Sequence, residues 1–322
     1  MRFFSILFAL LSVLPASALT TQQRSAALES LRRGQADSAI RLLNSSLRDQ
    51  PGDAQAHQLL CRVYLQEERW DEAVQECSQS VALASGDSDN HLWLGRAEGE
   101  RADRVTFVTA YRLGRKVHAE FETAVQLNPF NVEALSDLGE FYVEAPPVVG
   151  GGVTKAQAIA VRLQSLDSAR AYELRGRIAV QEKDPSRAES YFRVAITSSP
   201  HPASYWMVLA SFYRKSEQWD KMRQAMLAGI AADREHGAAT VDAAHLLMRA
   251  RRDPEMSIRL LQSYLASPNQ SESAPAFQVR NDLAALLAAQ GDSAGAQQQL
   301  AAATALASGY HPAEAIKTHT GR

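Results

Sequence analysis

Apolar positions between residues 172 and 200 recur with the spacing of two consecutive helices. In the second half of this stretch Ala188, Phe192 and Ala195 recur at intervals of four and three, which places them on one stripe of a 3.6-residue helix. A polar run at 182–185 separates the two apolar segments. The pattern therefore predicts a pair of short amphipathic helices joined by a tight turn.

The same pattern recurs along most of the chain with a period of 34 residues. The small residues at the close-contact position of successive first helices are Ala27, Cys61 and Gly95, and, further on, Gly176, Ala210 and Ala244. The residues that close successive units, Pro200, Arg234 and Pro268, keep the same spacing. Because neither helix of such a unit can bury its apolar stripe alone, the period predicts stacked helix pairs with a continuous core.

The unit resembles the tetratricopeptide repeat (TPR), whose first helix carries a W-x2-L-G-x2-Y pattern and whose second carries A-x3-F. The first-helix pattern is matched by Trp206, Leu209, Ala210 and Tyr213, and by Leu135, Leu138, Gly139 and Tyr142. The second-helix pattern is followed by Ala188 with Phe192 and by Ala73 with Cys77. The resemblance extends over residues 19–307 and implies an all-α fold, a right-handed α-solenoid of about eight helix-turn-helix repeats. It also implies a binding scaffold rather than an enzyme.

Two connections between the first and second helices are longer than the repeat requires. One excess lies at 101–113, which has helical character and is predicted to lengthen the helices of the third unit. The other lies at 144–154, which contains two prolines followed by Gly150, Gly151 and Gly152. Both are expected to project from one edge of the solenoid, and insertions of this kind often form a binding face.

The C-terminal part departs from the period in a different way. A polar linker at 267–276 precedes the last unit, which is rich in alanine and carries Gln297–Gln299. One polar face is typical of a terminal capping repeat. Residues 308–322 are expected to form a loose polar tail.

The first 18 residues have the layout of a secretory signal peptide. Arg2 is followed by an apolar run and then by Ala16-Ser17-Ala18, which predicts cleavage before Leu19. The apolar run is shorter than the roughly 20 residues that span a bilayer, although an uncleaved anchor is the alternative. We expect an exported protein of the periplasm or extracellular space, with no stable membrane insertion after cleavage.

The charge balance excludes one class of partner. The chain has 34 Lys and Arg against 36 Asp and Glu, for a formal net charge of -2. Nucleic-acid binding relies on an excess of basic residues, so we expect no nucleic-acid partner.

No motif for catalysis, a cofactor or a metal stands out. The glycines at 150–152 lack the Lys-Ser/Thr and the preceding strand of a phosphate-binding loop, so a flexible turn is the favoured interpretation. The histidines are scattered, and none pairs at the i, i+4 spacing of a zinc-binding helix. We therefore expect no catalytic residues, no cofactor and no metal site.

The two cysteines, Cys61 and Cys77, belong to the two helices of the second unit. Export would place them where a disulfide persists. The alternative is two buried free thiols that pack as small apolar side chains, and the sequence leaves both open.

The TPR resemblance implies that the first helices line a concave groove. Exposed groove residues are then expected to include Arg62, Arg96, Glu100, Glu140, Arg177, Arg214 and His245. Arg62 and Arg96 occupy equivalent positions in consecutive units, and together they form a candidate site for a carboxylate on an extended peptide. The alternative is a solvated surface.

These observations favour a non-enzymatic scaffold or adaptor in a bacterial cell envelope that holds a protein or peptide in its groove. Self-association through the end units is a second form of partner. The alternative is an accessory protein or enzyme subunit that binds a small ligand or a cell-wall polymer between the two insertions.

Overall fold

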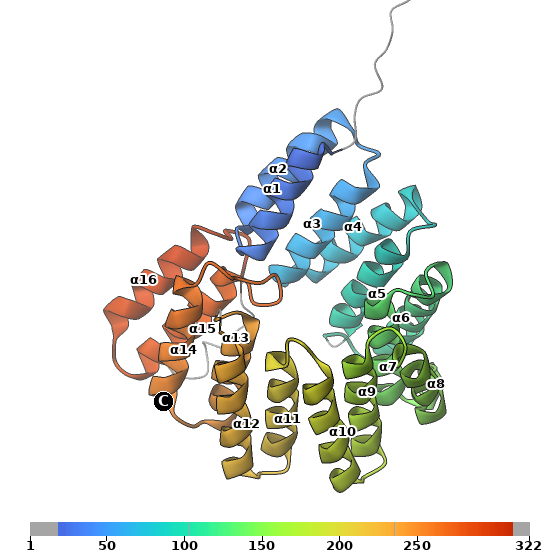
Figure 1. The fold of residues 1–322 in the computed structure, drawn as a ribbon. Coiled ribbons are helices and arrows are strands. Elements are labelled where there is room, and N and C mark those ends of the chain that lie inside the picture. Colours follow the sequence, from blue (N-terminus) through green and yellow to red (C-terminus); the bar gives the residue numbers. More distant parts are fainter. Residues whose placement is uncertain (1–18, 103, 235, 312–322) are drawn as a thin grey trace, which may run out of the picture.

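Sixteen α-helices, arranged as eight consecutive hairpins, make up the described part of the chain (Figure 1). The structure is a computed structural model, and it describes residues 19–102, 104–234 and 236–311. The predicted signal peptide and the last eleven residues lie outside this range. The sequence-based prediction of an all-α solenoid of about eight repeats is confirmed.

The first four hairpins contain the two longer connections. Their helices are α1 (Thr21–Arg32), α2 (Ala36–Asp49), α3 (Ala54–Gln66), α4 (Trp70–Leu83), α5 (Ser88–Ala102), α6 (Phe107–Leu127), α7 (Val132–Glu144) and α8 (Val153–Leu163), with a short 3₁₀ helix η1 (Pro147–Val149) between the last two. The excess residues at 101–113 lie mainly in α6, which has 21 residues against 14 in α4.

The last four hairpins are more regular. Their helices are α9 (Ser168–Gln181), α10 (Pro185–Ser198), α11 (Ala203–Lys215), α12 (Trp219–Ala232), α13 (Ala238–Ala250), α14 (Pro254–Ala266), α15 (Ala276–Ala289) and α16 (Ser293–Thr304). No helix among the described residues combines the length and the apolar composition needed to cross a bilayer.

Left-handed residues and aspartate caps explain where the helices begin and end. The tight turns within six of the hairpins have a residue with positive φ after the first helix, namely Gly34, Glu68, Lys183, Glu217, Arg251 and Gly291, and the turn at Arg251 has a second one, Asp253. A left-handed residue directly after a helix ends it by redirecting its last carbonyls. In three of these hairpins an aspartate side chain then accepts a hydrogen bond from the first turn of the following helix, namely Asp184 for α10, Asp253 for α14 and Asp292 for α16. The hairpins without this turn are the two with enlarged connections.

The repeated small residues let the two helices of a hairpin approach closely. Ala27, Cys61, Ala210 and Ala244 are fully buried. A Cβ placed on Gly95 would lie 2.5 Å from Cε1 of Phe121 on the other helix of its hairpin. The period of 34 read from the sequence therefore marks the positions at which a buried small residue lets a second helix pack closely.

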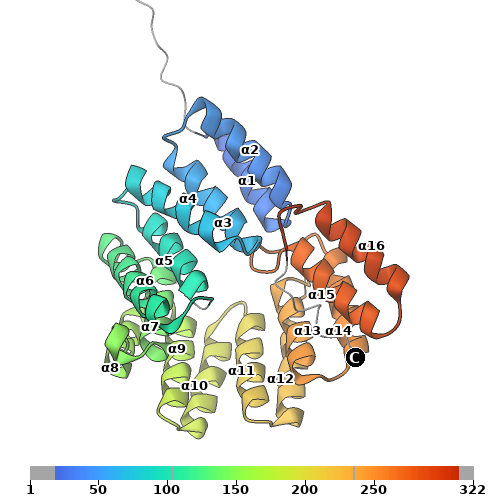
Figure 2. The same ribbon diagram turned by 180° about the vertical axis from the view of Figure 1, so that it is seen from behind.

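The chain closes on itself, so that the last hairpin packs against the first (Figures 1 and 2). Phe277 of α15 is fully buried in one apolar cluster with Leu31, Leu43 and Leu59. At the same contact the backbone N–H of Asp37 donates to the carbonyl of Leu306 at 3.0 Å. The end units, which the sequence offered for self-association, cover each other.

The start of the predicted tail and part of the predicted linker are packed in this closure. Ser308 donates through its N–H and its hydroxyl to Asp37, at 3.1 and 3.0 Å, and the ring of Tyr310 lies 4.9 Å from that of Phe277. The prediction of a loose tail is therefore wrong for residues 308–310, and residues 312–322 lie outside the described part of the chain. Within the linker, Arg32 donates to the carbonyls of Pro268 and Gln270 at 2.9 and 3.0 Å.

Candidate binding cavity

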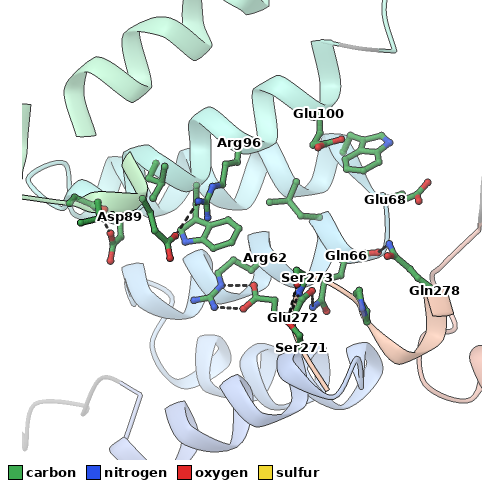
Figure 3. Close-up of a pocket in the computed structure, with 18 of the residues that line it drawn as sticks. Arg62, Gln66, Glu68, Asp89, Arg96, Glu100, Ser271, Glu272, Ser273 and Gln278 are labelled. Atoms are coloured by element: carbon green, nitrogen blue, oxygen red, sulfur yellow. Dashed lines mark hydrogen bonds and ion pairs between the residues drawn. The ribbon is translucent and has the colours of Figure 1, made fainter. Parts of the chain in front are cut away.

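A cavity of about 1140 Å³ lies between α3, α5, the start of α7 and the linker before α15 (Figure 3). Its walls come from both ends of the chain, because Arg62 and Gln66 of α3 line it together with Glu272 and Gln278, to which they are hydrogen-bonded. The closure of the ring therefore creates this cavity.

An indole between two guanidinium groups forms one wall. The guanidinium carbons of Arg62 and Arg96 lie 4.8 and 4.5 Å from the ring centre of Trp93. Arg104 lies 4.3 Å from the ring of Trp70 at the same cavity. Cations over an indole face are attracted by its negative quadrupole, so these stacks hold the arginines in place.

The arginine pair predicted from the sequence is present, but the chain itself supplies carboxylates to both. Arg62 donates from Nε and Nη2 to the two carboxylate oxygens of Glu272, at 2.9 and 2.5 Å. Arg96 donates to Asp137 at 2.6 Å and to Glu133 at 3.1 Å. The prediction of two solvent-accessible arginines awaiting a peptide carboxylate is therefore incomplete.

Gln66 joins the linker to α3 at the floor of the cavity. Its side-chain nitrogen donates to the carbonyls of Glu272 and Leu31, at 2.9 and 3.1 Å. Gln278 in turn donates to the backbone carbonyl of Gln66 at 2.8 Å. Gln66 is only 7% exposed, and its buried side-chain oxygen has no hydrogen-bond partner.

The remaining predicted groove residues do not all gather here. Glu100 lines this cavity together with Arg62 and Arg96. Arg177 lines a second cleft of about 610 Å³ between α7, α9, α11 and α13, where it pairs with Glu140 at 2.7 Å. Arg214 and His245 line neither cleft, and His245 contacts Asp282 at 2.8 Å.

The connection at 144–154 folds back instead of projecting as predicted. Val149 is buried against Gly114 of the lengthened helix α6, and a Cβ on Gly150 would meet the ring of His118. The N–H groups of Gly151 and Gly152 donate to the carbonyls of Pro146 and Tyr142, at 3.2 and 2.8 Å. Gly151 is buried against Ala145, so a side chain there would overlap the backbone. The connection at 144–154 therefore packs on α6, the helix that the other insertion lengthens, and these N–H groups are already engaged.

Cys61 and Cys77 form a disulfide in the structure, with a Cα–Cα distance of 5.3 Å. Both are fully buried, and the bond joins α3 to α4 directly behind Arg62. The disulfide therefore fixes the helix that presents Arg62 and Gln66 to the cavity.

Sequence reasoning missed Trp93, Gln66 and Glu272. Trp93 stands two residues before the small residue of its helix, where the neighbouring units carry Leu59 and Asp137, so its aromatic character was a usable signal. Glu272 carried no signal, because a polar linker gives no indication of which element it contacts.

Two comparisons with known proteins bear on the family, and a third found nothing. Tetratricopeptide repeat profiles match residues 30–96 and 151–203. Among curated proteins, none is a detectable sequence relative.

Solved structures match the fold over long stretches. A thermophilic TPR protein of Thermus thermophilus is 16% identical over 59% of this chain and 97% of its own, with a TM-score of 0.51. Yeast Tom70 is 16% identical over 91% of this chain and 62% of its own, with a TM-score of 0.56. At this identity the likeness concerns the fold alone. The repeat period, the eight helix hairpins and the two profile matches together show that the chain is a tetratricopeptide repeat protein.

Proposed function

We propose that the protein is an exported, non-enzymatic scaffold of the bacterial cell envelope that holds a segment of a partner protein in the cavity between α3, α5 and the linker. TPR proteins are in general protein-interaction scaffolds, which supports the scaffold role. The layout of residues 1–18 supports export.

The observation that carries the proposal is that one wall of the cavity is itself a chain segment docked on α3. Residues 271–273 line the cavity, and Glu272 accepts hydrogen bonds from α3 through its side chain and its backbone carbonyl. Its volume of about 1140 Å³ exceeds the roughly 300–1,000 Å³ of ordinary small-molecule pockets. Its walls combine partly exposed indole surface with arginine and amide donors, which suits a polypeptide with both side chains and backbone groups.

Site-specific photocrosslinking in cells tests the proposal. A photoreactive amino acid replaces Trp93 in the cavity, and a matched variant carries it at Gln79, which is exposed on α4. We expect a protein crosslinked from position 93 and absent from position 79, with one short peptide of the partner attached. Crosslinking from position 79 alone, or from neither position, would contradict the cavity as the binding site.

The mature N-terminus tests the export part separately. N-terminal sequencing of the envelope fraction is expected to begin at Leu19. A chain that retains residues 1–18 would overturn cleavage, and recovery in the cytoplasm alone would overturn export.

A further inference from the structure

The turn at residues 271–273 enters the cavity as an acidic peptide would. Its acidic side chain, Glu272, receives both hydrogen bonds from Arg62, and its backbone carbonyl accepts from Gln66. The flanking residues, Ser271 and Ser273, are small and hydrogen-bond to each other through their hydroxyls at 2.9 Å. Figure 3 shows the tip of the turn, residues 271–273, reaching from the linker to α3.

The base of the turn is held independently of the tip. Tyr264, which is fully buried, accepts a hydrogen bond from the N–H of Ser271 at 2.7 Å and donates to the carbonyl of Ala274 at 2.6 Å. The ring closure itself rests on other residues, including Phe277 and Arg32. The Glu272 side chain can therefore leave Arg62 without opening the ring.

The contact that Glu272 makes can be exchanged for an equivalent one. The side chains of Arg62 and Glu272 are 16% and 27% exposed, so water screens their attraction only in part. A competing carboxylate of similar geometry would form the same two hydrogen bonds with Arg62, so the exchange replaces one ion pair by another of the same kind. Since even exposed ion pairs contribute up to about a fivefold effect on an equilibrium constant, removing the Glu272 carboxylate should raise the affinity for a competitor by at least that order.

The fit of the tip is also incomplete. Gln66 uses its side-chain nitrogen on Glu272, while its buried side-chain oxygen has no partner. A carboxamide can both donate to a carbonyl and accept from an N–H of an extended chain. A segment that presents an N–H to this oxygen as well would satisfy an atom that the intramolecular contact leaves unpaired.

The two arginines beside Trp93 differ in where their carboxylates come from. Arg96 pairs with Glu133 and Asp137, both on the rigid helix α7, whereas Arg62 pairs with a residue of a connecting turn. Arg62 is therefore the position at which an incoming carboxylate can replace a resident one. Since Glu68, Asp89 and Glu100 also line the cavity, a run of several acidic residues would be repelled.

We infer that the partner segment bound here is an extended peptide with a single acidic residue between small polar residues, and that it replaces Glu272 on Arg62 and Gln66. The inference rests on the proposed scaffold function and specifies the chemistry of its ligand. The linker turn is then a built-in competitor that weakens the binding of this peptide.

The test uses the chain from Leu19 to Arg322 and a synthetic peptide with the linker's own sequence, Asn269 to Ala276, blocked at both ends. A second peptide has Gln in place of the Glu. Binding is followed by the shift of the Trp93 indole N–H in nuclear magnetic resonance spectra, because Arg62 stacks on that ring. We expect Glu272→Gln to bind the Glu peptide at least about fivefold more tightly than the wild type does.

Three further results are expected of the same spectra. The Glu272→Gln protein should bind the Gln peptide less tightly than the Glu peptide. Adding Arg62→Gln to this protein should remove the difference in affinity. Glu140→Gln is the matched control, because it removes one carboxylate from Arg177 at the equivalent position of a later unit without touching the cavity, and it should gain no affinity. Equal binding of the two peptides by Glu272→Gln, or an equal gain in Glu140→Gln, would overturn the inference.

Failure of this inference is distinguishable from failure of the scaffold function. If crosslinking from position 93 captures a partner while Glu272→Gln shows no preference for the Glu peptide, the cavity binds a segment of different chemistry and only the inference fails. If position 93 captures nothing, the scaffold function in this cavity fails. Urea unfolding of each variant confirms that the changes in binding do not come from loss of the fold.

Discussion

Two glycines on α5, Gly95 and Gly99, allow the effect of close packing on stability to be distinguished from that of helix propensity. A Cβ on Gly95 would lie 2.5 Å from the Phe121 ring, whereas on Gly99 the nearest such atom is Cγ2 of Val117 at 4.0 Å. Replacing either glycine by alanine favours the helix by up to about 1 kcal/mol. At Gly95 the overlap opposes this gain, because overpacking a tight core costs about 1–3 kcal/mol.

We therefore expect Gly95→Ala to lower the free energy of unfolding and Gly99→Ala to raise it. The propensity gain is common to both, so the two variants should differ by about 1–3 kcal/mol in urea unfolding. Equal stabilisation by the two substitutions would contradict the close contact between α5 and α6.

The predicted processing site also has a structural consequence. The backbone nitrogen of Leu19 donates to Oδ2 of Asp53 at 2.7 Å, and both residues are buried. Cleavage before Leu19 would turn this nitrogen into an ammonium group, and hydrogen bonds between charged groups are worth more than neutral ones.

Asp53→Asn is therefore expected to destabilise a chain that begins at Leu19 by about 1.5–3 kcal/mol. It should cost less in a chain with extra residues before Leu19, where the nitrogen is a neutral amide. Thermal unfolding of the four proteins checks this, and an identical loss in both backgrounds would exclude an ammonium–carboxylate pair. Asp53 also caps α3, and because asparagine is as good a capping residue as aspartate, the substitution retains the cap in both backgrounds.

His57 gives the stability a defined pH dependence. Its Nδ1 lies 2.6 Å from a carboxylate oxygen of Glu76 and its Nε2 lies 3.1 Å from the carbonyl of Pro51. The hydrogen bond to Glu76 raises the pKa of His57, and burial opposes it only in part. Because the folded-state pKa lies above the unfolded value of about 6.5, the stabilisation is fully present below about pH 6.5 and is lost as the pH rises through the folded-state pKa.

The difference in free energy of unfolding between the wild type and His57→Gln should therefore be largest in acid and should become smaller at alkaline pH. Urea unfolding at several pH values between 5 and 9 measures it. A gap that widens with pH would show that the imidazole is bound in its neutral form.

At the scale of the element, the repeat could be predicted from the sequence because each hairpin uses the same local features. Small residues at the helix contact and a left-handed residue in the turn recur every 34 positions, from Gly34 to Glu68 and from Lys183 to Glu217. Local rules of this kind leave a trace in a single sequence. The two insertions were located for the same reason, as departures from the period.

What the insertions contact could not be read in the same way. The packing of Val149 on Gly114 and the position of Glu272 beside Arg62 depend on the three-dimensional path of the chain. Ring closure joins residues more than 200 positions apart, and no local pattern encodes such a pairing. The sequence thus predicted the arginines of the cavity and missed the carboxylate that faces one of them.

The disulfide links α3 to α4, so its loss should destabilise that hairpin more than the rest of the chain. A cross-link that closes a loop of 16 residues is worth about 3 kcal/mol in the loop-entropy description. Each helix hairpin of a solenoid contacts mainly its neighbours, which makes its stability partly local.

We therefore expect Cys61→Ala/Cys77→Ala to increase amide hydrogen exchange in α3 and α4 far more than in α9 to α12. Exchange followed by mass spectrometry measures both regions in one sample. Uniform acceleration along the chain, or none, would contradict a local role for the bond.

On the scale of the whole molecule, the closed ring determines what the cavity can do. Its lining includes Arg62 and Gln66 from the second hairpin, Glu272 from the connection between α14 and α15, and Gln278 from α15. An open solenoid would leave the first and last hairpins with exposed apolar faces, available to other molecules. Closure covers these faces and places the acidic turn opposite Arg62.

Disulfide trapping between Asp37 and Ser308 tests this closure most directly. The N–H of Ser308 donates to the carboxylate of Asp37 at 3.1 Å, so Asp37→Cys/Ser308→Cys places two thiols together only if the ends meet. At micromolar concentration under mild oxidation we expect nearly complete intramolecular bonding, seen by mass spectrometry and by gel mobility. A control, Asp37→Cys/Ser165→Cys, should form none, because Ser165 lies in the connection between α8 and α9. A chain that stays reduced, or that forms only dimers, would show an open solenoid and would remove the cavity on which the proposed function depends.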